Sequence, residues 1–257
     1  MTRALTRSHF PCSRLVRTLT DLTVLEADEP GAGFADRLSQ WVGFADAIGL
    51  CAVHSESPAA APPARVGKSS PARDGIDEEF ARARLALENS IRMSCRPGAG
   101  KARLELPMPM AGASVKEASA YGPYRRFHAA QQRDMELTVR ALRARFREKI
   151  AVDAPGLGQL VDLDEAMEAI LGEREAKLLA TVTSLLEKRF GQLLRSAHQA
   201  AAAAGLEDSP ALWMKPGGWL LGFCQELEMV LLAELELRLQ PALGLIEAWN
   251  NERTKLT

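Results

Sequence analysis

Histidine and cysteine side chains are the groups in this chain best suited to metal binding or nucleophilic catalysis, and there are four of each. Their spacing matches no metal-binding or redox motif, and no H-E-x-x-H pattern is present. His128 is the histidine of most interest, because Tyr124 and Arg125 lie about one helical turn before it. A surface or packing role is still favoured for it. The residues are His9, His54, His128 and His198, with Cys12, Cys51, Cys95 and Cys224.

The segment 95–102 superficially resembles a phosphate-binding loop. Cys95 replaces its first glycine, Ala102 stands where a hydroxyl should bind Mg²⁺, and no buried strand precedes it. A G-x-S-x-G elbow and a dinucleotide-binding glycine fingerprint are also missing. The sequence therefore predicts a non-enzymatic protein with no catalytic residues, metal or cofactor.

A basic stripe is the main electrostatic feature of the chain. Residues 124–150 carry eight Lys or Arg against three acids, a net charge of +5. Spacing by seven residues places several arginines in one row of a helix. Such a stripe is suited to an acidic partner surface or to nucleic-acid phosphates. The candidate binding residues are Arg126, Arg133, Arg140, Arg143 and Arg147.

Three binding modes remain open for this stripe: acidic regions of the same chain, a protein partner, or nucleic acid. The N-terminal residues and the last helix both supply acids for internal pairing. Nucleic acid is the less favoured mode, because no zinc finger, helix-turn-helix signature or aromatic ladder accompanies the arginines.

A long helix is predicted over 163–204, with Asp162 as its N-cap, Glu165 completing a capping box and Gly205 at its end. A helix of about forty residues would be on the order of 60 Å long. The chain's own helices alone could not bury a helix of that length. We therefore expect a seam that meets other helices, of a protein partner or of a second copy in a coiled-coil-like homo-oligomer. The predicted interface residues are Leu171, Leu178, Leu185, Trp219, Phe223 and Trp249.

The composition predicts an all-α protein, because Leu and Ala dominate the 47% apolar fraction while aromatics make up only 5% of 257 residues. We expect an elongated helical bundle with a long central helix. An N-terminal helical hairpin, 1–54, would be joined to it by a flexible Pro/Ala-rich linker, 55–75. The elongated body would cover 76–257.

Within these units the apolar spacing predicts individual helices. Ser13 is the expected N-cap of the first, and the second begins at Phe34. The body would hold helices over 76–94, 123–152 and 219–239, with a short tail helix after a kink at Pro241. Residues 97–122 are expected to form an irregular loop with a short extended piece at 104–106.

Charge and hydropathy favour a cytoplasmic, soluble protein. The net charge of −1 gives no general attraction to nucleic acid or anionic lipid. The most apolar stretches carry regularly placed charges such as Asp46 and Glu226, which disfavour membrane insertion.

Three stretches together resemble an uncharacterised proteobacterial family, a domain of unknown function. They are 13–22 with 34–41, 124–136 continuing into 142–145, and 232–241 with 244–248. Members of this family resemble the accessory proteins of type III Zorya anti-phage defence, which accompany a MotA-like proton channel and a MotB/OmpA-like peptidoglycan-binding protein. The resemblance implies no catalytic residues.

The expected function is that of a non-enzymatic interaction protein with protein partners. The resemblance implies an accessory role in Zorya-like antiviral defence, working with the MotA/MotB-like membrane complex at the inner face of the inner membrane. The alternative is a nucleic-acid-binding effector that uses the basic helix.

Overall fold

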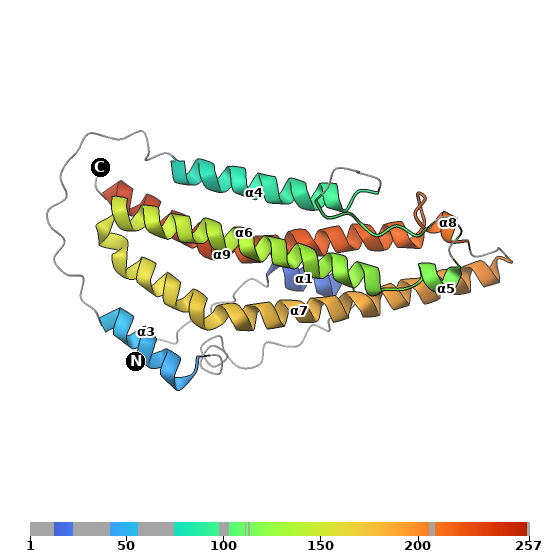
Figure 1. Cartoon of the computed structure of the whole chain (residues 1–257), viewed down its shortest axis with the longest axis horizontal. Helices are drawn as coiled ribbons and strands as arrows, with labels where there is room; N and C mark the ends of the chain where they lie inside the picture. The colour runs from blue at the N-terminus through green and yellow to red at the C-terminus, as the bar shows by residue number, and fades with distance from the viewer. Residues whose placement is uncertain are drawn as a thin grey trace, which may run out of the picture.

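The computed structural model describes residues 13–22, 42–55, 75–97, 103–110, 112, 114–205 and 209–255. This part of the chain is helical and contains no strand, which confirms the all-α prediction. Four long helices lie side by side along one axis and form an elongated bundle (Figure 1). They are α4 (Gly75–Ser94), α6 (Gly122–Asp153), α7 (Gly158–Ala203) and α9 (Trp219–Lys255).

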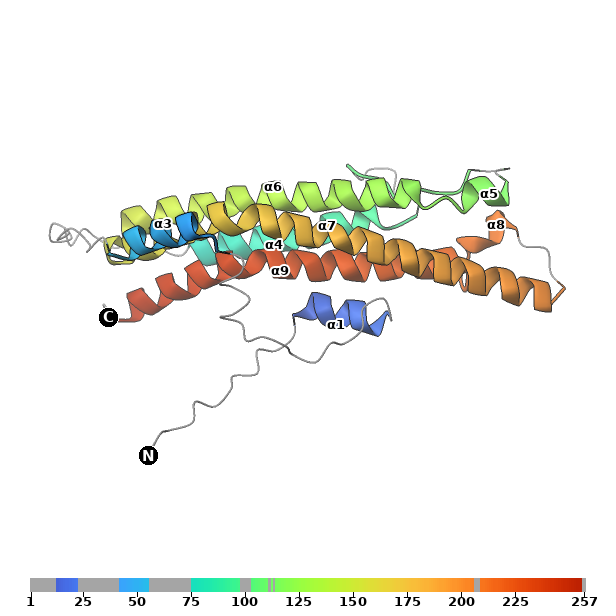
Figure 2. The same ribbon diagram turned by 90° about the horizontal axis from the view of Figure 1, so that it is seen from below.

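The core lies between α6, α7 and α9, with α7 antiparallel to the other two (Figure 2). Large side chains from all three helices are almost completely buried in it. One end of the core is aromatic, because Phe190 of α7 lies 5.1 Å from the ring of Phe223 and 5.1 Å from that of Trp219. Representative fully buried side chains are Phe146, Leu186, Phe223 and Leu231.

The long central helix is confirmed, but its predicted start is wrong. The 3₁₀ turn η2 (Pro155–Leu157) leads directly into α7 at Gly158, so Asp162 lies inside the helix and is not its N-cap. Burial of Val161 and packing of Leu160 against the core favour the earlier start. The helix ends at Ala203, and Gly205 follows with a positive φ of 63°.

The predicted end of the last long helix at 239 is also wrong, because α9 continues through Pro241 to Lys255. Proline removes one helical hydrogen bond and crowds the preceding turn. The residues beyond it are nevertheless buried, namely Ala242, Leu245, Ile246 and Trp249. Their packing on the bundle outweighs the local cost.

The N-terminal helices pack on different parts of the body. Helix α1 (Arg14–Asp21) begins where predicted, since Ser13 Oγ accepts a hydrogen bond from the Val16 amide. It packs on α9, whereas α3 (Phe44–Ser55) packs on α7. The two helices lie well apart in both views, so they do not form the expected hairpin. Residues 34–41 and the linker between Ser55 and Gly75 lie outside the described residues.

The loop between α4 and α6 has more local structure than expected. Helix α5 (Val115–Ala118) is a single turn held by a capping box, in which Ser114 and Glu117 bond each other's backbone amides. Residues 104–106 form no strand, although the Leu106 amide donates to the Ser94 carbonyl at 3.2 Å. Helix α8 (Pro210–Trp213) forms a second short turn before α9.

Candidate functional site

The basic stripe of α6 is divided into a paired half and an exposed half. In the paired half, Arg143 binds the Asp164 carboxylate of α7 through Nε and Nη2, at 2.8 and 2.6 Å. Arg147 reaches the same carboxylate through Nη1 at 2.8 Å, and Glu168 through Nη2 at 2.7 Å. Such charge-assisted, bidentate contacts are strong and directional.

Burial strengthens the structural role of this cluster, since the side chains of Arg143 and Arg147 are only 13% and 11% exposed. Burial alone would lower the pKa of Arg147, but the hydrogen bonds that Arg147 donates to Asp164 and Glu168 raise it overall. Both arginines therefore join α6 to α7. Pairing within the chain was one of the predicted modes, but the acids that take part belong to α7.

The C-terminal part of α6 also binds α4 through Glu79. Lys149 donates to Glu79 at 2.9 Å, and Arg145 lies 3.1 Å from the same carboxylate. The hydrogen bond from Lys149, with the positive charges around it, lowers the pKa of Glu79. These contacts fix α4 along the bundle.

The exposed half of the stripe consists of Arg126, Arg133 and Arg140. All three side chains face solvent, and none forms an ion pair with any residue that the structure describes. Their spacing of seven residues keeps them in one row along α6. This row is available to an anionic partner.

The predicted leucine and tryptophan interface is mostly used inside the molecule. Leu178 is exposed, while Leu185 and Trp219 are partly buried and pack against the core. Phe223 and Trp249 are buried among the helices, out of reach of a partner unless the bundle opens. Of the six predicted interface residues, the exposed Leu178 and the half-buried Leu171 could still contact a partner. An interface through these two leucines stays a prediction.

A groove where α6, α7 and α9 meet brings together three of the predicted site residues: Leu171, Arg140 and Arg143. Its volume is about 620 Å³. Half of the residues that line it are charged, and the other half are apolar or glycine. Apart from the three already named, the lining residues include Val139, Met167, Gly172, Glu175, Arg238 and Pro241.

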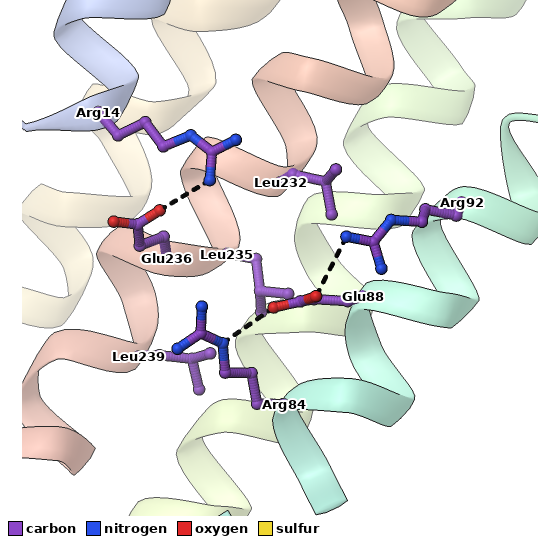
Figure 3. A pocket seen from close by; sticks show the side chains of 8 residues that line it. All are labelled: Arg14, Arg84, Glu88, Arg92, Leu232, Leu235, Glu236 and Leu239. Carbon is purple, nitrogen blue, oxygen red and sulfur yellow. Dashed lines mark hydrogen bonds and ion pairs between the residues drawn. The ribbon is translucent and has the colours of Figure 1, made fainter. Parts of the chain in front are cut away.

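A smaller cavity of about 210 Å³ lies between α1, α4 and α9 (Figure 3). Leu232, Leu235 and Leu239 of α9 line it, and ion pairs surround it. Glu88 binds Arg84 at 2.9 Å and Arg92 at 3.2 Å, and Arg14 of α1 binds Glu236 at 3.1 Å. Every charged group lining this cavity is thus paired, so it offers no free recognition group.

A buried polar network crosses the bundle core and was not predicted. His128 of α6 is fully buried, with Nδ1 3.0 Å from Thr183 Oγ1 and Nε2 3.0 Å from Glu234 Oε1. Gln132 donates to the other oxygen of Glu234 at 2.8 Å and to the Leu179 carbonyl at 2.9 Å. Of the surface and packing roles expected for His128, its burial supports packing, and no solvent-accessible general base is present in this network.

Two cysteine thiols that are buried in the core are poor nucleophiles. Burial raises the pKa of both Cys95 and Cys224 to about 12, so neither is a thiolate at neutral pH. Among the residues with described positions, no group of His, Cys, Asp and Glu is arranged to hold a metal ion. The same part of the chain contains no helix that is both long and apolar enough to cross a membrane.

Comparison with known proteins gives one match. A family model described as "Protein of unknown function (DUF3348)" matches residues 1–251. Neither the curated proteins nor the solved structures contain a significant match to the chain.

Proposed function

The chain belongs to the DUF3348 family of proteins of unknown function, and from that premise we propose that it is a non-enzymatic helical interaction protein. Its exposed arginine row, defined as Arg126, Arg133 and Arg140 of α6, would contact an acidic surface of a protein partner. The observation that carries this proposal is the division of the stripe. The arginines that face α7 are paired, whereas the row is exposed and without ion pairs in the described structure.

Electrostatics explain why such a row favours association. Exposed like charges repel one another even when hydrated, and an acidic partner relieves this repulsion and accelerates encounter. Long, rigid helices add a large surface without flexible loops. The row therefore serves as the recognition element, and the paired half of the stripe holds it in place.

The test is co-purification of the tagged chain expressed from its own genomic locus. One variant carries Arg126→Glu, Arg133→Glu and Arg140→Glu. A matched control carries Arg17→Glu, Lys188→Glu and Arg195→Glu, which change the net charge equally at exposed sites elsewhere. We expect the partner to be lost from the row variant and retained by the control. Equal recovery from both would refute the proposed role of the row.

Nucleic acid is the second candidate ligand, and the same exposed row favours it. Binding of DNA or RNA would weaken as salt rises, and would weaken further in the row variant but not in the control. If the purified chain carries nucleic acid that high salt removes, and no protein partner, nucleic acid would replace the acidic protein partner as the ligand of the row.

We further propose that the partner belongs to a Zorya-like anti-phage defence system. The support is the resemblance of three sequence stretches to the accessory proteins of type III Zorya. The chain would then be a cytoplasmic component recruited to the inner face of the inner membrane by a MotA/MotB-like proton-driven complex. Co-purification of a proton-channel subunit is expected, and its absence from a preparation that contains other specific partners would contradict this assignment.

A further inference from the structure

Arg238 of α9 is buried without an adequate partner. Its side chain is 7% exposed, and the nearest carboxylate, Glu175 of α7, lies 3.9 Å from Nη1. Its buried Nε–H has no hydrogen-bond partner within the described part of the chain. A buried guanidinium ordinarily has its donors satisfied by a carboxylate or phosphate, because desolvating it otherwise costs free energy. Among the described anionic groups, Arg238 has only the long contact with Glu175.

Arg238 lines the groove at the junction of α6, α7 and α9, which has a volume of about 620 Å³. This value lies within the roughly 300–1,000 Å³ of small-molecule sites. Space is available because Ala169, Gly172 and Ala176 present small surfaces along α7, and a Cβ built on Gly172 meets no atom within 4 Å.

We propose that this groove, which we call the Arg238 site, binds a small molecule with a carboxylate attached to an apolar body. The carboxylate would accept hydrogen bonds from the Arg238 guanidinium in place of the distant Glu175. The apolar body would lie against Val139, Leu171 and Pro241. This site does not depend on the proposed role of the exposed arginine row.

The other charged groups around the groove are largely balanced. Glu168 is neutralised by Arg147, and Glu173 by Lys177 at 2.7 Å. Glu136 and Arg140, which both line the groove, are exposed and form no ion pair with the described residues, so the rim carries one unpaired charge of each sign. The preference for a carboxylate therefore rests on the buried Arg238 and not on the rim.

The test is isothermal titration calorimetry of the full chain with two probes of equal length, octanoate and octanol. We expect octanoate to bind better, because octanol cannot form an ion pair with Arg238. Equal or stronger binding of octanol would overturn the proposal.

Two variants locate the binding. Arg238→Met keeps an unbranched stem but removes the charged guanidinium, and should weaken octanoate binding roughly tenfold to a hundredfold, the usual effect of losing a charged hydrogen bond. Gly172→Leu should fill the groove and abolish binding. Gly222→Leu is the matched control, because the Cβ of Gly222 also meets nothing within 4 Å and the residue does not line the groove.

Helix content from circular dichroism verifies that each variant is folded. If Arg238→Met does not fold, the effect of Gly172→Leu on octanoate binding alone decides whether the groove is the binding site. Undetectable octanoate binding to the wild type, binding that survives either groove variant in its folded form, or loss of binding in the Gly222→Leu control would each overturn the assignment.

Discussion

His128 shows how a single residue determines the packing of three helices. Its two ring nitrogens contact α7 and α9, and Glu234 depends on it and on Gln132 for its hydrogen bonds. Replacing His128 by Leu leaves a buried carboxyl group without one of its partners. We expect the free energy of unfolding to fall by about 1–3 kcal/mol.

Urea denaturation followed by circular dichroism measures this change. The control is Arg133→Leu on the exposed face of the same helix, which should alter stability by no more than about 0.5 kcal/mol. An equal effect of the two substitutions would show that the buried network contributes nothing specific.

Replacing two glycines by alanine should change the stability of the protein in opposite directions. Gly172 lies inside α7 with open space around it, so Gly172→Ala should raise the free energy of unfolding by about 1 kcal/mol through helix propensity. Gly218, just before α9, has no such room: a Cβ there would collide with the backbone carbonyls of Leu212 and Trp213. Gly218→Ala should therefore lower the thermal midpoint, while Gly172→Ala raises it. Parallel thermal melts compare the two, and shifts of the same sign would contradict the packing described.

At the scale of elements, the docking of α4 on α6 should depend on pH. The pKa of Glu79 is lowered below its ordinary value of 4.5 by Lys149 and the cations around it. A lowered folded-state pKa means that this contribution to stability is fully present above the ordinary pKa. It is lost as the pH falls through the folded-state value.

Denaturation at pH 7 and near pH 3 detects this loss. Because Glu79→Gln removes the titrating group, the variant should be less stable than the wild type at pH 7, and the difference should shrink in acid. The Glu79 carboxylate is partly solvated, so the effect is expected to be modest. A difference that grew on acidification would contradict the assignment.

The elements also show what sequence patterns could and could not predict. Apolar spacing predicted helices α4 and α6 nearly to their ends and α7 except for its start, and Ser13 was correctly identified as an N-cap. The pattern ended the last long helix too early, because tertiary burial of Trp249 and its neighbours continues α9 through Pro241.

Most of the other features that the sequence patterns did not predict depend on contacts between residues far apart in the chain. The stripe on α6 was visible, but the rotation of α6 against α7 decides that Arg143 is paired and Arg133 exposed. The groove at Arg238 likewise joins residues from three helices, and the partner of His128 is 106 positions away. No local spacing rule relates such positions.

At the scale of the whole molecule, length is the defining property. Helix α7 has 46 residues, so it alone spans about 69 Å at 1.5 Å per residue. A compact globule of this chain length would have a radius of gyration of about 18 Å. Small-angle X-ray scattering of the monomer should give a clearly larger radius and a maximum dimension of at least about 69 Å. A radius near 18 Å would contradict the extended bundle.

The docking of α1 on α9 has a consequence for synthesis on the ribosome. Arg14 and its partner Glu236 are 222 positions apart, so the first described helix must wait for the last before it can dock. At about 5–20 residues per second, that delay is roughly 10–45 seconds. During this interval Leu15, Leu19 and Leu22 lack the surface that buries them, and the nascent chain carries an apolar helix face that a chaperone can bind.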